Sequence, residues 1–251
     1  MEILCEVEPP RTPDLTRLRE QIAVLAPVVD SFLVPDNHLG AATVSSIATA
    51  REVLDQGGKP VAVLNARDRN VLGFRRDLLT AAAWGVDHFL FVYGDRPKEG
   101  RSVGDLTVRG MINDVSGTVD SLLFRGYPSF RCGATIRLGQ ELQWRKAADW
   151  LCVQVTFQTK RLFEWRAQLD YSGQMYAGVL VLASRRMAES VNASIPGIRV
   201  PQAIVDKLDD PHVGLDLACE QIEAVRSSGL FTGVHLIPVN RYREMAARLA
   251  V

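Results

Sequence analysis

Two carboxylates lie at the end of the first predicted strand, where burial would decide their chemistry. Residues 3–8 read Ile-Leu-Cys-Glu-Val-Glu, and two prolines end the run. Alternation along a strand places Glu6 and Glu8 on one face, together with Leu4. A carboxylic acid among apolar neighbours favours its protonated form and can donate a proton near neutral pH. A solvated edge strand would carry the same residues without such a role, so the rest of the chain must decide.

Short apolar runs typical of buried parallel strands recur along the first half of the chain, each followed by polar residues. The runs cover residues 29–34, 60–64 and 88–92. The polar residues after them include Asp36, Asn65, Arg67, Asp68 and Asp95. Helical patterns separate the runs, over 14–25, 43–56 and 70–84. Because the carboxyl ends of the strands form the catalytic face of a β/α barrel, this recurrent polarity predicts a site there.

The alternation continues in the second half and predicts one closed barrel. Strands are predicted over 130–134, 151–155, 176–182 and 233–237. Helices are predicted over 138–150, 160–169, 184–194, 213–227 and 241–249. About eight strand–helix repeats in 251 residues predict a (β/α)8 TIM barrel, a single domain over 1–251 with no linker. The only long loop, 96–108, follows a strand on the predicted catalytic side, where it is either a lid or a surface loop.

Composition excludes several classes of protein. Lys plus Arg equals Asp plus Glu at 29 each, so the chain has no electrostatic footprint for nucleic acid or an anionic membrane. No apolar stretch is long enough to cross a bilayer, and the first strand begins too early for a signal peptide. The four cysteines lack CxxC spacing, which favours reduced thiols in a cytoplasmic protein.

Metal and nucleotide motifs are also missing from the sequence. The four histidines have no ligand spacing, so we expect no metal site, and we interpret His88 and His235 as hydrogen-bonded strand histidines. Neither GxGxxG nor GxxxxGK[ST] occurs, which argues against a Rossmann or P-loop site. A GxSxG nucleophile elbow is absent as well.

Several segments resemble, in order along the chain, the signatures of the methylenetetrahydrofolate reductases. They are Cys5-Glu6-Val7-Glu8-Pro9-Pro10-Arg11, Asp36-Asn37, Arg67-Asp68-Arg69-Asn70, Gly94-Asp95-Arg96-Pro97, Gln154, Ile195-Pro196-Gly197-Ile198 and Gly233-Val234-His235-Leu236. The second and third of these are most similar to the branch whose reductase is often fused to a homocysteine methyltransferase. The resemblance spans essentially the whole chain.

This resemblance implies a TIM barrel that reduces 5,10-methylenetetrahydrofolate to 5-methyltetrahydrofolate with NAD(P)H, normally through FAD, in one-carbon metabolism and methionine biosynthesis. Glu6 takes the family's general-acid position and would protonate the bridging nitrogen of the folate. Glu8 would contact the substrate and is the rival proton donor. Asp95 would lie near flavin and pterin, and Gln154 would hydrogen-bond the pterin. A homo-oligomer or a methyltransferase partner would fit this branch.

The same resemblance assigns a set of residues to the cofactor. They are Asp36, Asn65, Arg67, Asp68, Asn70 and Asp95. The alternative for the third strand end is an Arg–Asp pair at a helix start, with Asn70 as N-cap. The chain departs from the family at Val63, Asn65, Ile136 and Thr43, where polar or stacking contacts to a dinucleotide are lost. Two alternatives therefore stay open, namely direct hydride transfer from NADH without flavin, and a non-catalytic folate-binding or subunit-forming paralogue.

Overall fold

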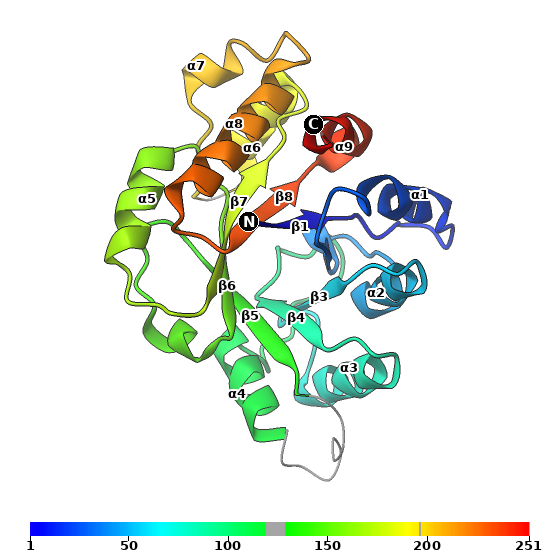
Figure 1. The fold of residues 1–251 in the computed structure, drawn as a ribbon. Coiled ribbons are helices and arrows are strands. Elements are labelled where there is room, and N and C mark those ends of the chain that lie inside the picture. Colours follow the sequence, from blue (N-terminus) through cyan, green and yellow to red (C-terminus); the bar gives the residue numbers. More distant parts are fainter. Residues whose placement is uncertain (119–128, 196, 251) are drawn as a thin grey trace.

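Eight parallel strands pair in chain order and close into a barrel (Figure 1). A computed structural model describes residues 1–118, 129–195 and 197–250. The strands are β1 (Glu2–Glu6), β2 (Ser31–Val34), β3 (Pro60–Asn65), β4 (His88–Val92), β5 (Arg131–Ile136), β6 (Trp150–Val153), β7 (Gln174–Leu180) and β8 (Gly233–Ile237). Pairing of β1 with β8, with Leu4 opposite His235, closes the ring. The chain is thus a TIM barrel, as the sequence predicted.

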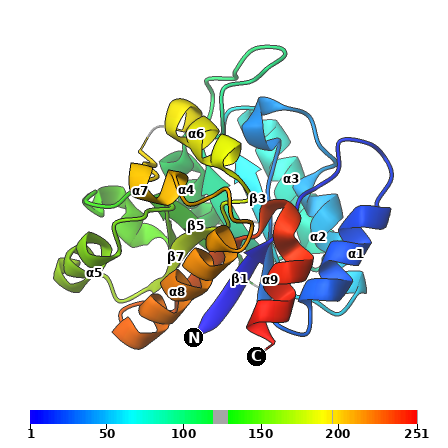
Figure 2. The ribbon, with the colours of Figure 1, turned by 90° about the horizontal axis from the view of Figure 1, so that it is seen from above.

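Helices surround the barrel when it is seen from above (Figure 2). They are α1 (Thr16–Leu25), α2 (Ser46–Asp55), α3 (Val71–Ala83), α4 (Val108–Thr118), α5 (Thr159–Gln168), α6 (Arg185–Ser194), α7 (Gln202–Val205), α8 (Val213–Ser228) and α9 (Tyr242–Leu249). Short 3-10 turns are η1 (His38–Gly40), η3 (Gln143–Ala147) and η4 (Val239–Arg241). The main core lies between strands and helices, where Phe74 packs edge-to-face on Phe91 at 5.4 Å between ring centroids.

A second apolar cluster fills the inside of the barrel, because alternate strand residues point inward. Its buried members are Leu4, Leu33, Val61, Val63, Leu90, Trp150, Cys152 and Tyr176. Trp150 is the largest of them, and Gly133 on β5 makes room for it, since a Cβ there would stand 2.2 Å from the indole. His88 and Tyr176 make T-shaped contacts with the indole, at 5.4 and 5.6 Å between ring centroids. The interior is therefore packed rather than open.

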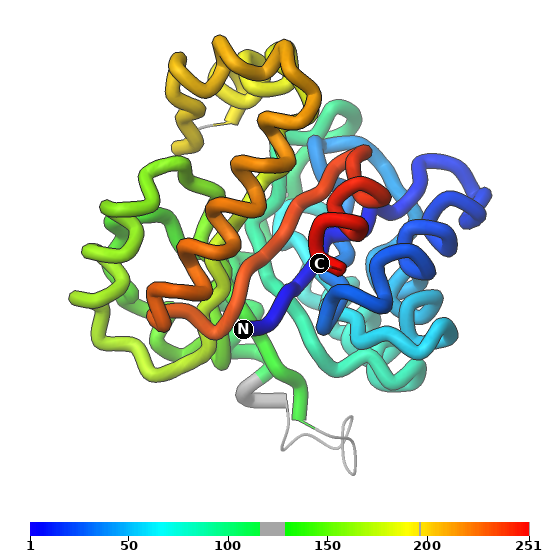
Figure 3. The backbone as a smooth tube through the Cα atoms, turned by 45° about the horizontal axis from the view of Figure 1, so that its top comes forward, coloured from blue at the N-terminus to red at the C-terminus, as the bar shows by residue number. Residues whose placement is uncertain are grey.

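Helices α6 and α7 form an insertion between β7 and α8 at one edge of the molecule (Figure 3). They pack with the ends of β6 and β7 around a separate small core, whose members include Leu182, Val191, Ile198 and Val205. Arg185 at the start of α6 pairs with Asp209 at 2.7 Å, which ties the insertion together. The insertion therefore covers the rim of the barrel beside β6.

Strands are where the sequence placed them to within a few residues, but some elements differ. The predicted helix over 138–150 is wrong, since only the η3 turn forms and Trp150 opens β6. Gly139 and Gln143 both take positive φ angles, which an α-helix cannot contain. The first strand ends at Glu6, because the N–H of Glu8 donates to the side chain of Gln21 instead of to a strand.

Helices α4 and α7 were not predicted from the sequence. Pro196 of the resembling segment Ile195-Pro196-Gly197-Ile198 lies outside the described residues. In the part of the chain that the structure describes, no helix combines the length and apolar character needed to cross a membrane.

Candidate functional site

The predicted polar residues do follow strands at one end of the barrel. Glu6 ends β1, and Gln154 comes directly after β6. Asp36, Arg67 and Asp95 come within three residues of the ends of β2, β3 and β4. In a parallel barrel these are all carboxyl ends, so the residues share the face where TIM-barrel sites are built. Sequence position alone had predicted this convergence.

Glu6 points into the barrel and meets a histidine there. Its side chain is 15% exposed, and its Oε2 lies 3.4 Å from Nε2 of His235 on β8. The other ring nitrogen, Nδ1, lies 3.3 Å from the sulfur of Cys152 on β6. Glu6, His235 and Cys152 therefore form a row of contacting side chains, from β1 through β8 to β6. The earlier interpretation of His235 as an ordinary hydrogen-bonded strand histidine missed this row.

The charge state of His235 follows from these contacts. Burial by itself disfavours the imidazolium, but the contacts with Cys152 and the Glu6 carboxylate outweigh it and raise the pKa of His235. Nε2 is buried without an aligned hydrogen bond, so its contact with Glu6 is an ion pair at 3.4 Å. The end of β1 therefore sets the carboxyl group of Glu6 beside an imidazole whose protonated form is favoured.

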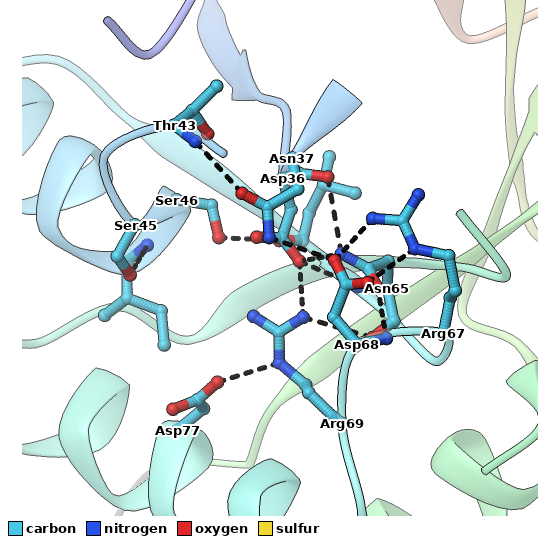
Figure 4. A network of polar contacts seen from close by, with 12 residues as sticks. Asp36, Asn37, Thr43, Ser45, Ser46, Asn65, Arg67, Asp68, Arg69 and Asp77 are labelled. Carbon is cyan, nitrogen blue, oxygen red and sulfur yellow. Dashed lines mark hydrogen bonds and ion pairs between the residues drawn. The ribbon is translucent and has the colours of Figure 1, made fainter. Parts of the chain in front are cut away.

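A second group of polar side chains joins the ends of β2 and β3 (Figure 4). Oδ2 of the buried Asp36 accepts from the backbone and side-chain N–H groups of Asn65, at 3.0 and 2.6 Å, and from Arg69 at 2.5 Å. Arg69 also donates to Asp77 of α3 at 2.8 Å. We call Asp36, Asn65, Arg67, Asp68, Arg69 and Asp77 the β2–β3 network. Arg69, which sequence reasoning gave no role, bridges the two carboxylates.

Arg67 and Asp68 form the neighbouring half of this network. Two guanidinium nitrogens of Arg67 donate to Asp68, each at 2.5 Å. Burial alone would raise the pKa of Asp68, but hydrogen bonds from Arg67 and Asn37 hold it below its ordinary value. Arg67 is only 2% exposed, and its Nη1 has no hydrogen-bond partner. That nitrogen is therefore a buried donor of the β2–β3 network whose hydrogen bond is not satisfied.

Asp95 lies on the loop after β4, which docks on the loop after β2. Its Oδ2 accepts from the N–H of Leu39 at 2.8 Å. Gly40 has a φ of +70°, and a Cβ there would stand 2.0 Å from the carbonyl oxygen of Arg96, so only glycine allows this approach. Further along, the N–H of Val103 donates to the carbonyl of Arg67 at 2.7 Å. The long loop is thus fastened to the rim at several points.

Asn70 caps helix α3, as one of the two sequence interpretations held. Its side-chain oxygen accepts from the N–H of Gly73 at 2.8 Å. The N–H of Val71, the first residue of α3, donates to Asp105 of the long loop at 2.8 Å. Polar groups at this helix start are therefore engaged with one another. Among the departures from the family, Val63 lies in the packed interior and Ile136 in the outer core.

Gln154 borders a polar cavity of about 370 Å³ at the ends of β5 and β6. The other lining residues are Arg137, Leu138, Gly139, Gln140, Val155, Thr156, Gln158, Arg161 and Gly197. Gln154 is half-buried, and its backbone N–H donates to the carbonyl of Ile136 at 2.9 Å. The cavity combines side-chain amides with two arginines, which suits a polar ligand carrying negative charge.

Metal-binding groups of three or more His, Cys, Asp or Glu side chains do not occur among the described residues. All four cysteines are free thiols. His88 differs from the sequence interpretation, because its Nε2 is buried without a hydrogen-bond partner. Burial, and to a lesser degree Arg131, lowers its pKa to about 4. His88 is thus a neutral packing residue in the barrel interior.

Fold and site define a TIM barrel with its polar residues gathered at the carboxyl ends of the strands. The family model of methylenetetrahydrofolate reductase matches residues 1–249. The chain therefore belongs to the methylenetetrahydrofolate reductase family.

Solved structures agree on the fold at low sequence identity. An uncharacterized protein from Clostridium thermocellum, which binds two copies of 5-methyl-5,6,7,8-tetrahydrofolic acid, is 12% identical with a TM-score of 0.69, covering 99% of this chain and 93% of that one. The tryptophan synthase alpha-subunit of Pyrococcus furiosus is 12% identical with a TM-score of 0.51, covering 90% and 98%. No curated protein matches the sequence.

Proposed function

We propose that this chain is an oxidoreductase that transfers hydride between NAD(P)H and 5,10-methylenetetrahydrofolate, giving 5-methyltetrahydrofolate, or catalyses the reverse oxidation. The observation that carries this proposal is the inward-facing carboxylate of Glu6, set against His235 at the end of β1 in a chain of the reductase family. Asp95 and Gln154 follow neighbouring strands on the same rim. A scaffold alone has no use for an ion pair in this place.

Glu6 would supply the proton that the reaction needs. Protonation of the bridging nitrogen of the folate breaks its bond to the one-carbon unit and leaves an iminium cation that accepts hydride. Because Glu6 is only 15% exposed, bulk water competes poorly for its proton. Once ionised, the carboxylate would stabilise the cation by charge. Gln154 would hold the pterin through its side-chain amide, and Asp95, fixed by the N–H of Leu39, would face the ring system from the opposite side of the rim.

The residues assigned to FAD by resemblance do not fit a tightly held flavin. The Asp36 oxygen Oδ2 already accepts three hydrogen bonds, and Arg67 is engaged with Asp68 through two nitrogens. The β2–β3 network leaves Nη1 of Arg67 as its unpaired buried donor. A dinucleotide that must displace such pairs loses about 1 kcal/mol for each. This supports direct transfer of hydride from a nicotinamide that does not bind across the β2–β3 network, with a flavin held weakly or not at all.

A non-catalytic folate-binding protein is the second candidate. It is favoured by the similar structure from Clostridium thermocellum, which binds 5-methyl-5,6,7,8-tetrahydrofolic acid. In that case the Gln154 cavity would still take folate, but Glu6 would have no step to perform. Binding of folate without turnover is the outcome that separates this candidate from the enzyme.

The test is an anaerobic assay of nicotinamide oxidation with 5,10-methylenetetrahydrofolate, with and without added FAD. We expect turnover without flavin, and a fall of roughly 10²-fold or more in the Glu6→Gln variant, the range for loss of a general acid. Glu8→Gln is the matched variant for the rival donor. Unchanged turnover in Glu6→Gln would remove Glu6 from the mechanism, and folate binding without turnover in the parent chain would favour the second candidate.

A further inference from the structure

We propose that Glu6 and His235 act as one proton-donating pair, in which His235 is the positioning residue that holds the proton and Cys152 fixes its ring. This deepens the proposed function and rests on it. The imidazole would store the proton as imidazolium, and the carboxylate would pass it to the folate. Neither the acid at β1 nor the histidine at β8 suffices alone in this arrangement.

Geometry gives His235 one partner on each ring nitrogen. Nε2 lies 3.4 Å from the Glu6 carboxylate, and Nδ1 lies 3.3 Å from the Cys152 sulfur. A contact on Nδ1 determines the rotation of the ring and thereby the direction in which Nε2 points. Such a third group that orients a proton carrier is the arrangement used by catalytic triads. Cys152 is buried in the barrel interior among apolar residues.

The surroundings of His235 leave Glu6 as its charged partner. On β7, the Tyr176 hydroxyl donates to the Glu2 carboxylate at 2.5 Å. These two groups are therefore paired with each other and not with His235. On β1, the Cys5 thiol faces the main core and donates to the backbone oxygen of Glu6 at 3.8 Å. Cys152 contacts the other ring nitrogen, Nδ1, at 3.3 Å. Within the described residues, the ion pair found for His235 is the one with Glu6. The raised pKa of His235 agrees with an imidazolium in this place.

The proton step conserves charge and needs no further reactant. The proton leaves Nε2 of His235 for Oε2 of Glu6 and passes from there to the bridging nitrogen of the folate. The bond between that nitrogen and the one-carbon unit breaks, and its electron pair stays with the nitrogen. Positive charge thus moves from imidazolium to iminium, while Glu6 is a carboxylate before and after. Hydride then neutralises the iminium, and His235 regains a proton from solvent through Glu6.

The pair can be tested without any turnover, by NMR of the full chain labelled with ¹⁵N-histidine. The His235→Gln spectrum assigns the signals of His235 among the four histidines. We expect both ring nitrogens of His235 to carry protons at about pH 8, and Glu6→Gln to lower the midpoint by about one pH unit or more. Glu8→Gln is the matched control and should leave that midpoint unchanged. A neutral His235 at that pH, or equal effects of the two variants, would overturn the proposal.

The role in catalysis is tested by the pH dependence of kcat/KM for the folate. Because the protonated pair is the active form, activity should fall as pH rises through its midpoint. In His235→Gln we expect activity to fall about 10- to 100-fold and the alkaline limb to move to lower pH by about one unit or more. Cys152→Ala should shift the alkaline limb of the pH profile in the same direction, and Cys152→Ser should restore it. If the alkaline limb of the pH profile stayed in place in a folded His235→Gln variant, the role of His235 in proton donation would be refuted.

The NMR titration and the pH profile distinguish failure of the Glu6–His235 pair from failure of the proposed enzyme function. If the parent chain binds folate but does not turn it over, the enzyme proposal fails, whereas the NMR titration still decides whether the pair holds a proton. If turnover is present but His235 is neutral, the enzyme stands and the pair falls. Circular dichroism of each variant shows whether the barrel has folded, and Cys152→Ser provides a conservative variant if His235→Gln does not fold.

Discussion

The two sides of the barrel rim treat their polar groups in opposite ways. On the β2–β3 side, the buried Asp36 is bound to Asn65 and to Arg69, whose side chain is 12% exposed and which also donates to Asn65. On the β6–β8 side, His235 has a misaligned ion pair and Gln154 faces a cavity of about 370 Å³. Paired groups fix a backbone, whereas open groups remain available to a ligand. The comparison predicts that substitutions on the first side reduce stability and those on the second reduce activity.

The largest effect is expected at Arg69, whose side chain is 12% exposed between Asp36 and Asp77. Arg69→Met leaves a buried Asp36 carboxylate without its cation, which costs about 3–5 kcal/mol of unfolding free energy. Chemical denaturation monitored by circular dichroism measures this. Arg76→Met is the matched control, because Arg76 pairs with the same Asp77 but is 75% exposed. We expect that control to cost less than about 1 kcal/mol. Equal losses in the two variants would contradict the assignment of Arg69 to a buried network.

The sequence predicted the fold and the end of the barrel at which the candidate residues lie, because both depend on local alternation. Short apolar strands and the polar residues after them locate Glu6, Asp36, Arg67, Asp95 and Gln154 once closure is assumed. The region over 138–150 was wrong, since positive φ angles at Gly139 and Gln143 depend on tertiary packing. Helix α4 follows the long loop and had no clear pattern in the sequence.

Contacts across the barrel could not be predicted in the same way. Cys152 and His235 are 83 residues apart and meet only because β6 and β8 both turn these side chains inward. The sequence did contain a weak signal, since period-2 alternation places His235 between Gly233 and Ile237 on one face of β8. Which neighbour it meets depends on register, and this is set when the ring closes. Bridging by Arg69 depends in the same way on where the fold places Asp77 of α3 relative to Asp36 after β2.

A smaller effect, on binding rather than stability, is expected at Gln154. Gln154→Leu keeps the size of the side chain but removes the amide that would hold the pterin. Loss of one such hydrogen-bonding group should raise KM for the folate about tenfold, while KM for NAD(P)H stays the same. Steady-state kinetics with each substrate varied in turn measures this.

Gln158→Leu is the control for this prediction. Gln158 lines the same cavity, but its side-chain oxygen already accepts from Arg161 at 3.2 Å. We expect it to change KM for the folate by much less than Gln154→Leu does. If the two variants were equally impaired, the cavity as a whole rather than the Gln154 amide would be responsible.

The smallest effect is expected at Asn70, at the edge of the β2–β3 side. The family resemblance assigns this residue to a cofactor, whereas its geometry is that of a helix cap. Its oxygen accepts from the Gly73 N–H at 2.8 Å, so Asn70→Ala should lower the unfolding free energy by about 1 kcal/mol, and Asn70→Ser, which still caps, should restore most of it. KM for NAD(P)H should stay within about twofold of the parent value in both variants, because a capping oxygen that is already engaged contributes little to a ligand. Thermal denaturation and steady-state kinetics on the same samples separate the two roles. A rise in KM that serine does not reverse, without loss of stability, would assign Asn70 to the nucleotide and extend the ligand site onto the β2–β3 side.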